Sequence, residues 1–216
     1  MKIDPSVALE KAALFGCAVM TGVGAVVNTA RVEAGASVAV FGMGGVGLSA
    51  VMGARAVGAY PIVAVDRLDE KLMLALSVGA THTINAAQDD PVEAVRELTG
   101  GGADYVFESV GNEAVLIQAY QSTGRGGTTI TIGLPHPDKM FSVPATGIVA
   151  EERTIKGSYM GSSVPRRDIP RYIKMYQAGI LPVAKLHTHT LRLDEINAGF
   201  DRLARAQAVR QVITFA

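Results

Sequence analysis

The chain has 216 residues, of which 49% are hydrophobic and 19% charged, so its composition excludes an intrinsically disordered protein. Twenty Lys and Arg residues balance twenty Asp and Glu residues, and no run of like charge predicts a nucleic acid or a membrane surface as a partner. Cys17 is the only cysteine, which excludes an internal disulfide framework and fits a cytoplasmic protein. We therefore expect one large domain, or one domain with an appendage, that binds a small molecule.

The first candidate element is an uncharged stretch from Ala12 to Ala30. Its length suits a signal peptide or a membrane span. However, the stretch contains several Gly, Thr and Asn residues, and the acidic Asp4 and Glu10 precede it. We therefore predict a buried helix in this part of the chain.

From residue 37 onwards, short β-branched runs alternate with helical patterns, and glycine-rich turns separate them. Alternation of this kind implies a parallel sheet that carries helices on both faces and is connected by right-handed crossovers. We therefore predict a doubly wound, mostly parallel α/β sheet. Its expected strands are residues 37–41, 61–65, 81–84, 105–107, 128–132 and 154–159, and its expected helices are residues 48–57, 69–78, 91–98 and 113–120.

The alternation loosens after residue 159, and the rest of the chain is predicted to be a C-terminal α/β extension of the sheet. The boundary near Gly157 rests on topology, because no change of composition marks a linker. The expected elements of the extension are a helix at 168–178, an alternating segment at 185–193, a helix at 194–206 and a strand at 212–215.

A G-x-G-x-x-G motif formed by Gly42, Gly44 and Gly47 follows the first strand of the predicted sheet and opens a helix. Gly42 permits the tight turn, Gly44 lets the backbone approach a pyrophosphate, and Gly47 lets helix and strand pack closely. Asp66 ends the next strand, where a carboxylate accepts hydrogen bonds from ribose hydroxyls and repels a 2′-phosphate. We therefore predict that residues 18–158 are a dinucleotide-binding Rossmann domain that prefers NAD(H) to NADP(H).

Two other interpretations of the motif stay open. The glycines would serve equally as turn and packing residues of an α/β sheet without a ligand. Methyltransferases that bind S-adenosylmethionine also place glycines after the first strand and an acid after the second, although their turns are usually less regular. Arg67, a cation next to the acid, weakens the preference for NAD(H), because it would tolerate the additional phosphate of NADP(H).

Three segments in the same order extend the pattern: GCAVMTGVGA at residues 16–25, VFGMGGVGL at residues 40–48 and VRQVITF at residues 209–215. Together with Asp66 they resemble the zinc-dependent, medium-chain alcohol dehydrogenase family, and the resemblance covers essentially the whole chain. This resemblance implies an NAD-dependent oxidoreductase. The complete enzyme would transfer a hydride between an alcohol or aldehyde substrate and NAD.

The resemblance also implies which residues contact NAD. Thr21 would contact the nicotinamide half, Asp66 and Lys71 the adenosine ribose, and Arg210 the pyrophosphate. Simpler interpretations are a solvated helix lysine for Lys71, the end of a strand for Arg210 and core packing for the apolar candidates. The remaining candidates belong to the glycine turn or to strand ends that would line the nicotinamide cleft: Gly42, Gly44, Gly45, Val46, Gly47, Val110, Ile132, Gly133 and Leu134.

Cys17 matches the position at which this family supplies one thiolate to its catalytic zinc, although a lone cysteine at an apolar helix start is more often a buried, inert residue. A catalytic zinc needs about three protein ligands and an open position. We expect no catalytic residue in this chain, and zinc only in a full-length parent. The four histidines show no ligand spacing with Cys17 and are assigned surface or packing roles: His82, His136, His187 and His189.

Members of the family carry a catalytic domain ahead of the equivalent of Gly16. The sequence is therefore interpreted as a fragment, in which residues 1–17 are a leading helical segment from the end of the absent catalytic domain. Residues 159–216 would complete that domain in the parent. We expect the isolated chain to be inactive and to expose an apolar face.

Two alternatives to a dehydrogenase fragment stay open: a non-catalytic NAD-binding module, and the zinc-free quinone oxidoreductase branch of the same superfamily, against which Cys17 argues. Members of the family commonly pair through the edge of the nucleotide-binding sheet. The apolar stretch Val143–Val149, which leads to Thr154–Gly157, would lie at such an edge unless it is a covered loop. Because an unpaired edge strand recruits another strand, we expect a homodimer.

Overall fold

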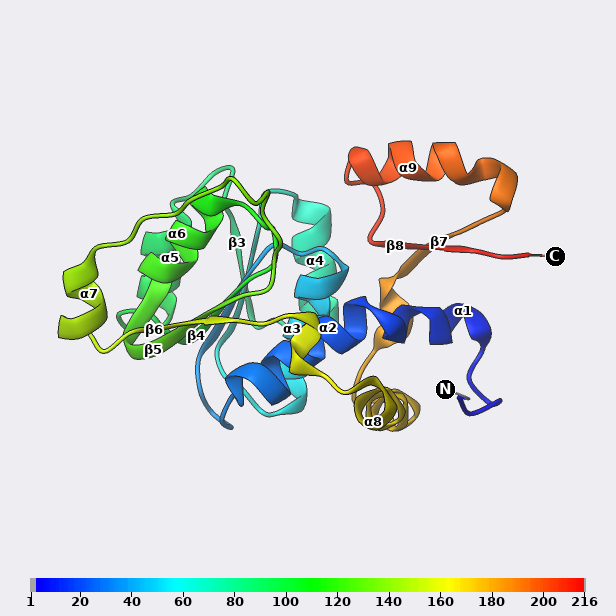
Figure 1. The fold of residues 1–216 in the computed structure, drawn as a ribbon, viewed down its shortest axis with the longest axis horizontal. Helices are drawn as coiled ribbons and strands as arrows, with labels where there is room; N and C mark the ends of the chain where they lie inside the picture. The colour runs from blue at the N-terminus through cyan, green and yellow to red at the C-terminus, as the bar shows by residue number, and fades with distance from the viewer. Residues whose placement is uncertain (1–2, 216) are drawn as a thin grey trace.

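The computed structural model describes residues 3–215, and its centre is a parallel six-stranded sheet in the order β3-β2-β1-β4-β5-β6 (Figure 1). The chain enters the middle of the sheet, builds one half outwards, and then crosses over to build the other half from β4. This arrangement confirms the predicted doubly wound fold. The strands are β1 (Val38–Phe41), β2 (Ile62–Asp66), β3 (His82–Asn85), β4 (Ala103–Glu108), β5 (Thr123–Thr131) and β6 (Thr154–Gly157).

Helices cover both faces of the sheet. One face packs against α2, α3 and α4, and the opposite face packs against α5 and α6. The α-helices are α1 (Leu9–Ala12), α2 (Ala18–Gly24), α3 (Gly45–Ala56), α4 (Asp69–Val78), α5 (Pro91–Leu98), α6 (Glu113–Ser122), α7 (Ala145–Ala150), α8 (Pro165–Gln177) and α9 (Ile196–Ala204). Shorter helical segments are η1 (Ala13–Gly16), the π-helical η2 (Ala25–Ala30), η3 (Met160–Ser162), η4 (Val183–Leu186) and η5 (Leu193–Glu195).

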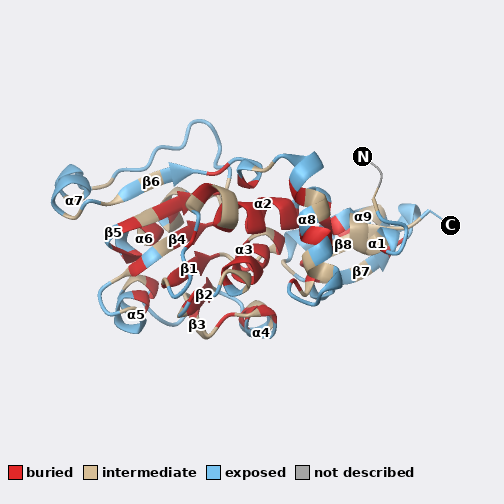
Figure 2. Ribbon diagram, turned by 90° about the horizontal axis from the view of Figure 1, so that it is seen from below, coloured by how far each residue is buried: buried red, intermediate tan, exposed pale blue. Residues whose placement is uncertain are grey.

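The central strands are apolar on both faces because helices bury both. On β1, Val38 and Val40 belong to the core under α2 and α3, whereas Ala39 and Phe41 belong to the core under α5 and α6. All four side chains are buried (Figure 2). The continuous apolar run in the sequence therefore reflects a strand that is covered from both sides.

Local signals explain where the helices on the second face begin. The Asp90 carboxylate accepts hydrogen bonds from the backbone N–H groups of Val92 (2.8 Å) and Glu93 (3.2 Å), and Pro91 occupies the first turn of α5. Asn112 accepts in the same way from Ala114 at the start of α6 (2.9 Å). These caps satisfy N–H groups that have no partner within the helix.

The C-terminal extension packs beside the sheet and contains the second, two-stranded sheet (Figure 1). Its strands β7 (His187–Leu191) and β8 (Arg210–Ile213) are parallel, and α9 lies in the connection between them. Helix α8 packs against α2, with Tyr172 and Ile173 buried in the main core. The extension is thus joined to the sheet through a common core.

The uncharged N-terminal stretch forms α2 and η2, and all seven residues of α2 are buried, as predicted (Figure 2). Within residues 3–215 no single helix is long and apolar enough to cross a membrane. The helical stretches 9–16 and 18–30 reach that size only as a pair, which is bent by 49°.

Several predicted boundaries were wrong, among them the starts of β4, β5 and α8, which lie two, five and three residues before the predicted ones. Helix α3 begins at Gly45, inside the glycine motif and not at Leu48, because glycine at these positions lets the first turn form against the strand. Strand β8 begins at Arg210, two residues before the predicted start. The apolar stretch at 143–149 contributes the short helix α7, and β6 forms the edge of the sheet.

Candidate functional site

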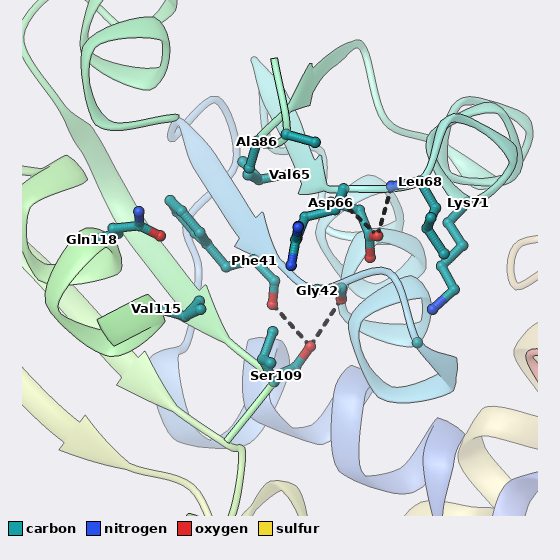
Figure 3. A pocket seen from close by; sticks show the side chains of 14 residues that line it. Phe41, Gly42, Val65, Asp66, Leu68, Lys71, Ala86, Ser109, Val115 and Gln118 are labelled. Carbon is teal, nitrogen blue, oxygen red and sulfur yellow. Dashed lines mark hydrogen bonds between the residues drawn. The ribbon is translucent and has the colours of Figure 1, made fainter. Parts of the chain in front are cut away.

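A cavity of about 640 Å³ opens at the carboxyl ends of β1, β2 and β4 (Figure 3). This position lies between β1 and β4, where the strand order reverses, and open α/β sheets bind their ligands in the crevice at that point. Five of the residues predicted from the sequence line the cavity: Gly42, Gly44, Asp66, Lys71 and Val110.

The three motif glycines meet different surroundings. Gly42 has a φ of +92°, a backbone conformation that favours glycine. A side chain on Gly47 would collide with the carbonyl oxygen of Gly42, so only glycine allows α3 to start this close to β1. A side chain on Gly44 would meet no atom within 4 Å, because that residue faces the open cavity. The space beside Gly44 and the N-terminus of α3 therefore suits an anion bound by backbone N–H groups.

Asp66 ends β2 and is held by the backbone. One carboxylate oxygen, Oδ2, accepts a hydrogen bond from the N–H of Met43 in the glycine turn (2.6 Å). The other, Oδ1, accepts from the N–H groups of Arg67 (2.8 Å) and Leu68 (3.1 Å). These bonds orient the acid at the cavity wall (Figure 3). Each oxygen can accept more than one hydrogen bond, so the carboxylate is still able to receive ligand hydroxyls.

Two cations stand beside this acid. Lys71, half-buried on the first turns of α4, lines the cavity together with the exposed Arg67. A carboxylate and an ammonium group at one end of a cavity can bind a vicinal diol from both sides, because one accepts and the other donates hydrogen bonds. Arg67 adds a donor that a phosphate would also use.

Arg210 reaches the glycine turn from the C-terminal extension. Its guanidinium lies so close to Gly45, the first residue of α3, that a side chain on Gly45 would collide with it. The Nε atom of Arg210 is buried and has no hydrogen-bond partner within residues 3–215. Because a buried donor without a partner is costly, this atom fits a site that an anionic ligand completes.

The strand-end candidates gather at the carboxyl ends of β4 and β5. Val110 and Leu134 are 53% and 79% exposed, so core packing does not explain these apolar side chains. Ile132 is buried under the strand end. A side chain on Gly133 would collide with the backbone N–H of Gly111. Glycine at position 133 therefore allows the loops after β4 and β5 to stay in contact.

Thr21 and Val46 lie where α2 crosses α3. Thr21 is buried, and the carbonyl oxygen of Val46 occupies the space that a side chain on Gly22 would need. The close approach of the two helices brings Thr21 near the start of α3. Neither residue lines the cavity itself.

Cys17 is exposed and precedes the first turn of α2, so the simpler interpretation of a buried, inert cysteine was wrong. Among residues 3–215, no group of three or more His, Cys, Asp or Glu side chains could hold a metal ion. Of the histidines, His187 accepts a hydrogen bond from Lys11 Nζ at its Nδ1 (2.7 Å), and His82 contacts Thr81 (2.9 Å). One cysteine does not make a zinc site, because a catalytic zinc needs about three protein ligands.

Several cavity residues were missed from the sequence. The Ser109 hydroxyl donates to the carbonyl oxygens of Phe41 (3.0 Å) and Gly42 (2.9 Å) and so ties the end of β4 to the glycine turn (Figure 3). A serine after a buried strand carries no strong signal, because its partners lie on another strand. The other missed lining residues form a mostly apolar wall: Phe41, Val65, Leu68, Ala86, Ala87, Val115 and Gln118.

The strand order, the glycine turn and the acid after β2 define a Rossmann-type fold of the class that binds dinucleotides. The family described as zinc-binding dehydrogenase matches residues 45–178. The chain belongs to this family.

Known proteins with similar sequences and structures support this family assignment. Over 215 residues the chain is 36% identical to alcohol dehydrogenase 1 of Pisum sativum and covers 56% of that protein. It superposes with a TM-score of 0.97 on an alcohol dehydrogenase zinc-binding domain protein from Burkholderia ambifaria, at 37% identity. Benzyl alcohol dehydrogenase from Acinetobacter calcoaceticus gives the same TM-score at 33% identity. Both structures match all of this chain, which covers 58% and 59% of theirs, so the chain spans somewhat more than half the length of its relatives.

Proposed function

We propose that this chain is the NAD-binding part of an alcohol dehydrogenase that transfers a hydride between an alcohol or aldehyde and NAD. The observation that carries the proposal is the glycine turn, which is open at Gly44. Asp66 contacts the turn at Met43, and Arg210, whose Nε has no partner within residues 3–215, contacts it at Gly45. A pyrophosphate would satisfy the turn and Arg210, and a ribose would satisfy Asp66.

In this proposal the residues of the chain bind and orient the cofactor. The glycine turn and Arg210 would hold the pyrophosphate, Asp66 and Lys71 the adenosine ribose, and Thr21, Val46, Val110, Ile132, Gly133 and Leu134 the nicotinamide half. When bound, NAD supplies the hydride acceptor. The exposed apolar surfaces of Val110 and Leu134 would exclude water from that end of the cavity.

The alcohol or aldehyde is a proposal for the whole protein, since its relatives named alcohol dehydrogenase are longer than this chain. Cys17 remains a predicted single ligand for a zinc ion in such a protein. Residues 18–158 are proposed as the cofactor domain and residues 159–216 as the extension.

Calorimetric titration of the chain with NADH and NADPH tests the proposal. We expect NADH to bind more tightly than NADPH, because the Asp66 carboxylate repels a 2′-phosphate. Asp66→Ala should weaken NADH binding by about 1 to 3 kcal/mol, or roughly 5- to 150-fold, because ribose hydrogen bonds are lost. The exposed Asp89→Ala is the matched control and should bind as the wild type does.

Asp66 also bonds to the backbone, so thermal unfolding of each variant must accompany the titration. A chain that binds S-adenosylmethionine and neither dinucleotide would overturn the proposal. Tight NADH binding without turnover of any alcohol by the full-length protein would favour the alternative of a non-catalytic NAD-binding module.

We further propose that the chain pairs with a second copy of itself through the edge of the sheet. Strand β6 is the outer strand next to β5, and α7 beside it has no buried residue (Figure 2). Exposed apolar side chains lie in and around these elements, including Met140 and Val149 at 85% and 81% exposure. An exposed edge with apolar neighbours is typical of an interface.

A further inference from the structure

Glu108, the last residue of β4, is a carboxylate that follows the run Tyr105–Phe107, and it is only 1% exposed. The ion pairs formed within residues 3–215 do not include it. A buried carboxylate persists only where hydrogen bonds compensate its lost hydration. The hydrogen-bond partners of Glu108 therefore indicate which part of the structure it stabilises.

The side chain holds the loop after β4. Oε1 of Glu108 accepts hydrogen bonds from the backbone N–H groups of Val110 and Gly111, both at 2.7 Å. Two short bonds to one charged oxygen fix the backbone of this loop, in which Gly111 has a φ of +79°. The exposed side chain of Val110 is thereby directed to the cavity wall.

The same residue also holds the loop after β5. Its carbonyl oxygen accepts from the N–H groups of Ile132 (2.8 Å) and Gly133 (3.2 Å). Its Oε2 atom accepts from the Thr131 hydroxyl (3.4 Å) and lies 3.0 Å from the position that a side chain on Gly133 would take. The two carbonyl bonds are backbone bonds that any residue here would make. The side chain of Glu108 itself therefore contacts the loop after β4 through Oε1 and, through Oε2, the end of β5 where the next loop begins.

In a sheet of this strand order, the two nucleotides of a dinucleotide lie over opposite halves, β1–β3 and β4–β6. Asp66 lies on the first half and Glu108 on the second. A residue that orders the loops after β4 and β5 therefore acts on the half of the ligand that is farther from Asp66.

We propose that Glu108 is a positioning residue, which preorganises the loops at Val110–Gly111 and Ile132–Gly133 for the nicotinamide half of the cofactor. This inference rests on the proposed function. Preorganised loops increase affinity because their ordering does not have to occur on binding. The adenosine half, held at β1 and β2, should be insensitive to Glu108.

The test compares NADH with ADP-ribose, which lacks the nicotinamide ring, in titrations of the chain and its variants. The wild type should bind NADH more tightly than ADP-ribose. Glu108→Ala should weaken NADH binding about tenfold and leave ADP-ribose binding within about twofold, the size of effect expected for one lost hydrogen-bonding arrangement. The fluorescence of bound NADH reports the surroundings of the nicotinamide and should shift towards that of the free form.

Glu108→Gln provides the rescue, because an amide oxygen at the position of Oε1 accepts the same two N–H groups. It should restore the preference for NADH. If Glu108→Ala does not fold, Glu108→Asp, which shortens the side chain by one methylene, should show the same selective loss. Glu97→Ala, an exposed residue on α5, is the control.

Equal losses for NADH and ADP-ribose, or no loss for either, would overturn the proposal while leaving NAD binding intact. A wild type that binds both ligands equally would also overturn it, because the nicotinamide half would then contribute nothing. A wild type that binds neither ligand would reject the proposed function itself, and the role of Glu108 with it.

Discussion

A carbon atom added to Gly44 and one added to Gly47 would have opposite effects, although the residues are three positions apart. At Gly44 the new atom would point into the open cavity, and the backbone φ of −77° is accessible to any residue. At Gly47 it would collide with the Gly42 carbonyl oxygen. Gly44 leaves space for a ligand, whereas Gly47 allows α3 to pack close to β1.

Substitution by alanine should separate these two roles. We expect the free energy of unfolding of Gly44→Ala to equal that of the wild type or to exceed it by up to about 1 kcal/mol, because alanine lowers the entropy of the unfolded chain. Its NADH affinity should fall at least tenfold, since the methyl group occupies the space for the pyrophosphate. Gly47→Ala should lose about 1 to 3 kcal/mol of unfolding free energy through overpacking.

Urea denaturation and NADH titration of both variants provide the measurement. A Gly44→Ala variant that binds NADH normally would show that the ligand does not approach the turn. A Gly47→Ala variant of normal stability would show that α3 can move away from β1.

At this scale the sequence predicted what depends on local spacing. The glycine turn and Asp66 follow from short distances along the chain, and the structure brings them to one cavity. Arg210 was identified only through the family resemblance, because its approach to Gly45 depends on how the distant β8 packs. Ser109 was missed because its partners, Phe41 and Gly42, lie on another strand and in the glycine turn. Glu108 was missed although a charged residue after the Tyr105–Phe107 run was a usable signal.

Asp168, a carboxylate with no exposed surface, joins the N-terminal part of α8 to η2. The Arg167 guanidinium donates to both of its oxygens (2.8 and 2.9 Å), and the N–H of Val164 donates to Oδ2 (2.7 Å). Asn28 of η2 contacts the same carboxylate (3.5 Å) and the Tyr172 hydroxyl (3.3 Å). Hydrogen bonding to Arg167 is the main reason that the pKa of Asp168 is lowered.

This lowered pKa makes the attachment of α8 sensitive to acid. Because the folded state holds the Asp168 carboxylate ionised, its stabilisation is complete above the ordinary Asp pKa of about 3.9 and is lost as the pH falls through the lower folded-state pKa. Asp168→Asn should reduce the unfolding free energy by about 2 kcal/mol at neutral pH, and the difference from the wild type should shrink in acid.

Urea denaturation at neutral and acidic pH measures this difference, with the exposed Asp201→Asn as the control. A deficit of the same size at both pH values would mean that packing, and not the charge of Asp168, attaches the helix.

The elements whose ends carry local sequence signals were predicted well, and those without such signals were not. Helices α4 and α5 have the expected bounds because caps and glycine ends mark them. Helix α7 was missed because a short apolar stretch fits a helix and a strand equally well. The parallel pairing of β7 with β8 depends on a crossover through α9, which no local pattern specifies.

Exposed apolar side chains occur at both ends of the long axis of the molecule. Helix α7 and β6 lie at one end of the long axis, and α1 lies at the other with the C-terminal extension (Figure 1). The exposed side chains at the first end include Val149, and those at the second include Leu9 at 78% exposure. At the first end the apolar residues adjoin β6, the edge strand of the six-stranded sheet, whereas the second end carries the two-stranded sheet of β7 and β8.

This difference predicts the outcome of one substitution at each end. The wild type should sediment as a dimer at micromolar concentration. Val149→Lys should shift it to a monomer, because a charge placed in an apolar interface must be desolvated. Leu9→Lys should remain a dimer. Analytical ultracentrifugation checks all three, and a monomeric wild type would reject pairing through this edge.

Arg210 gives the architecture a further property. Arg210 belongs to β8, yet its guanidinium lies against Gly45, the first residue of α3, which is far away in the sequence. An anion held at the start of α3 would thus be shared by the sheet and the extension. By thermodynamic linkage, binding of that anion stabilises the contact between the extension and the sheet. A change that weakens this contact lowers the affinity for the anion by the same free energy.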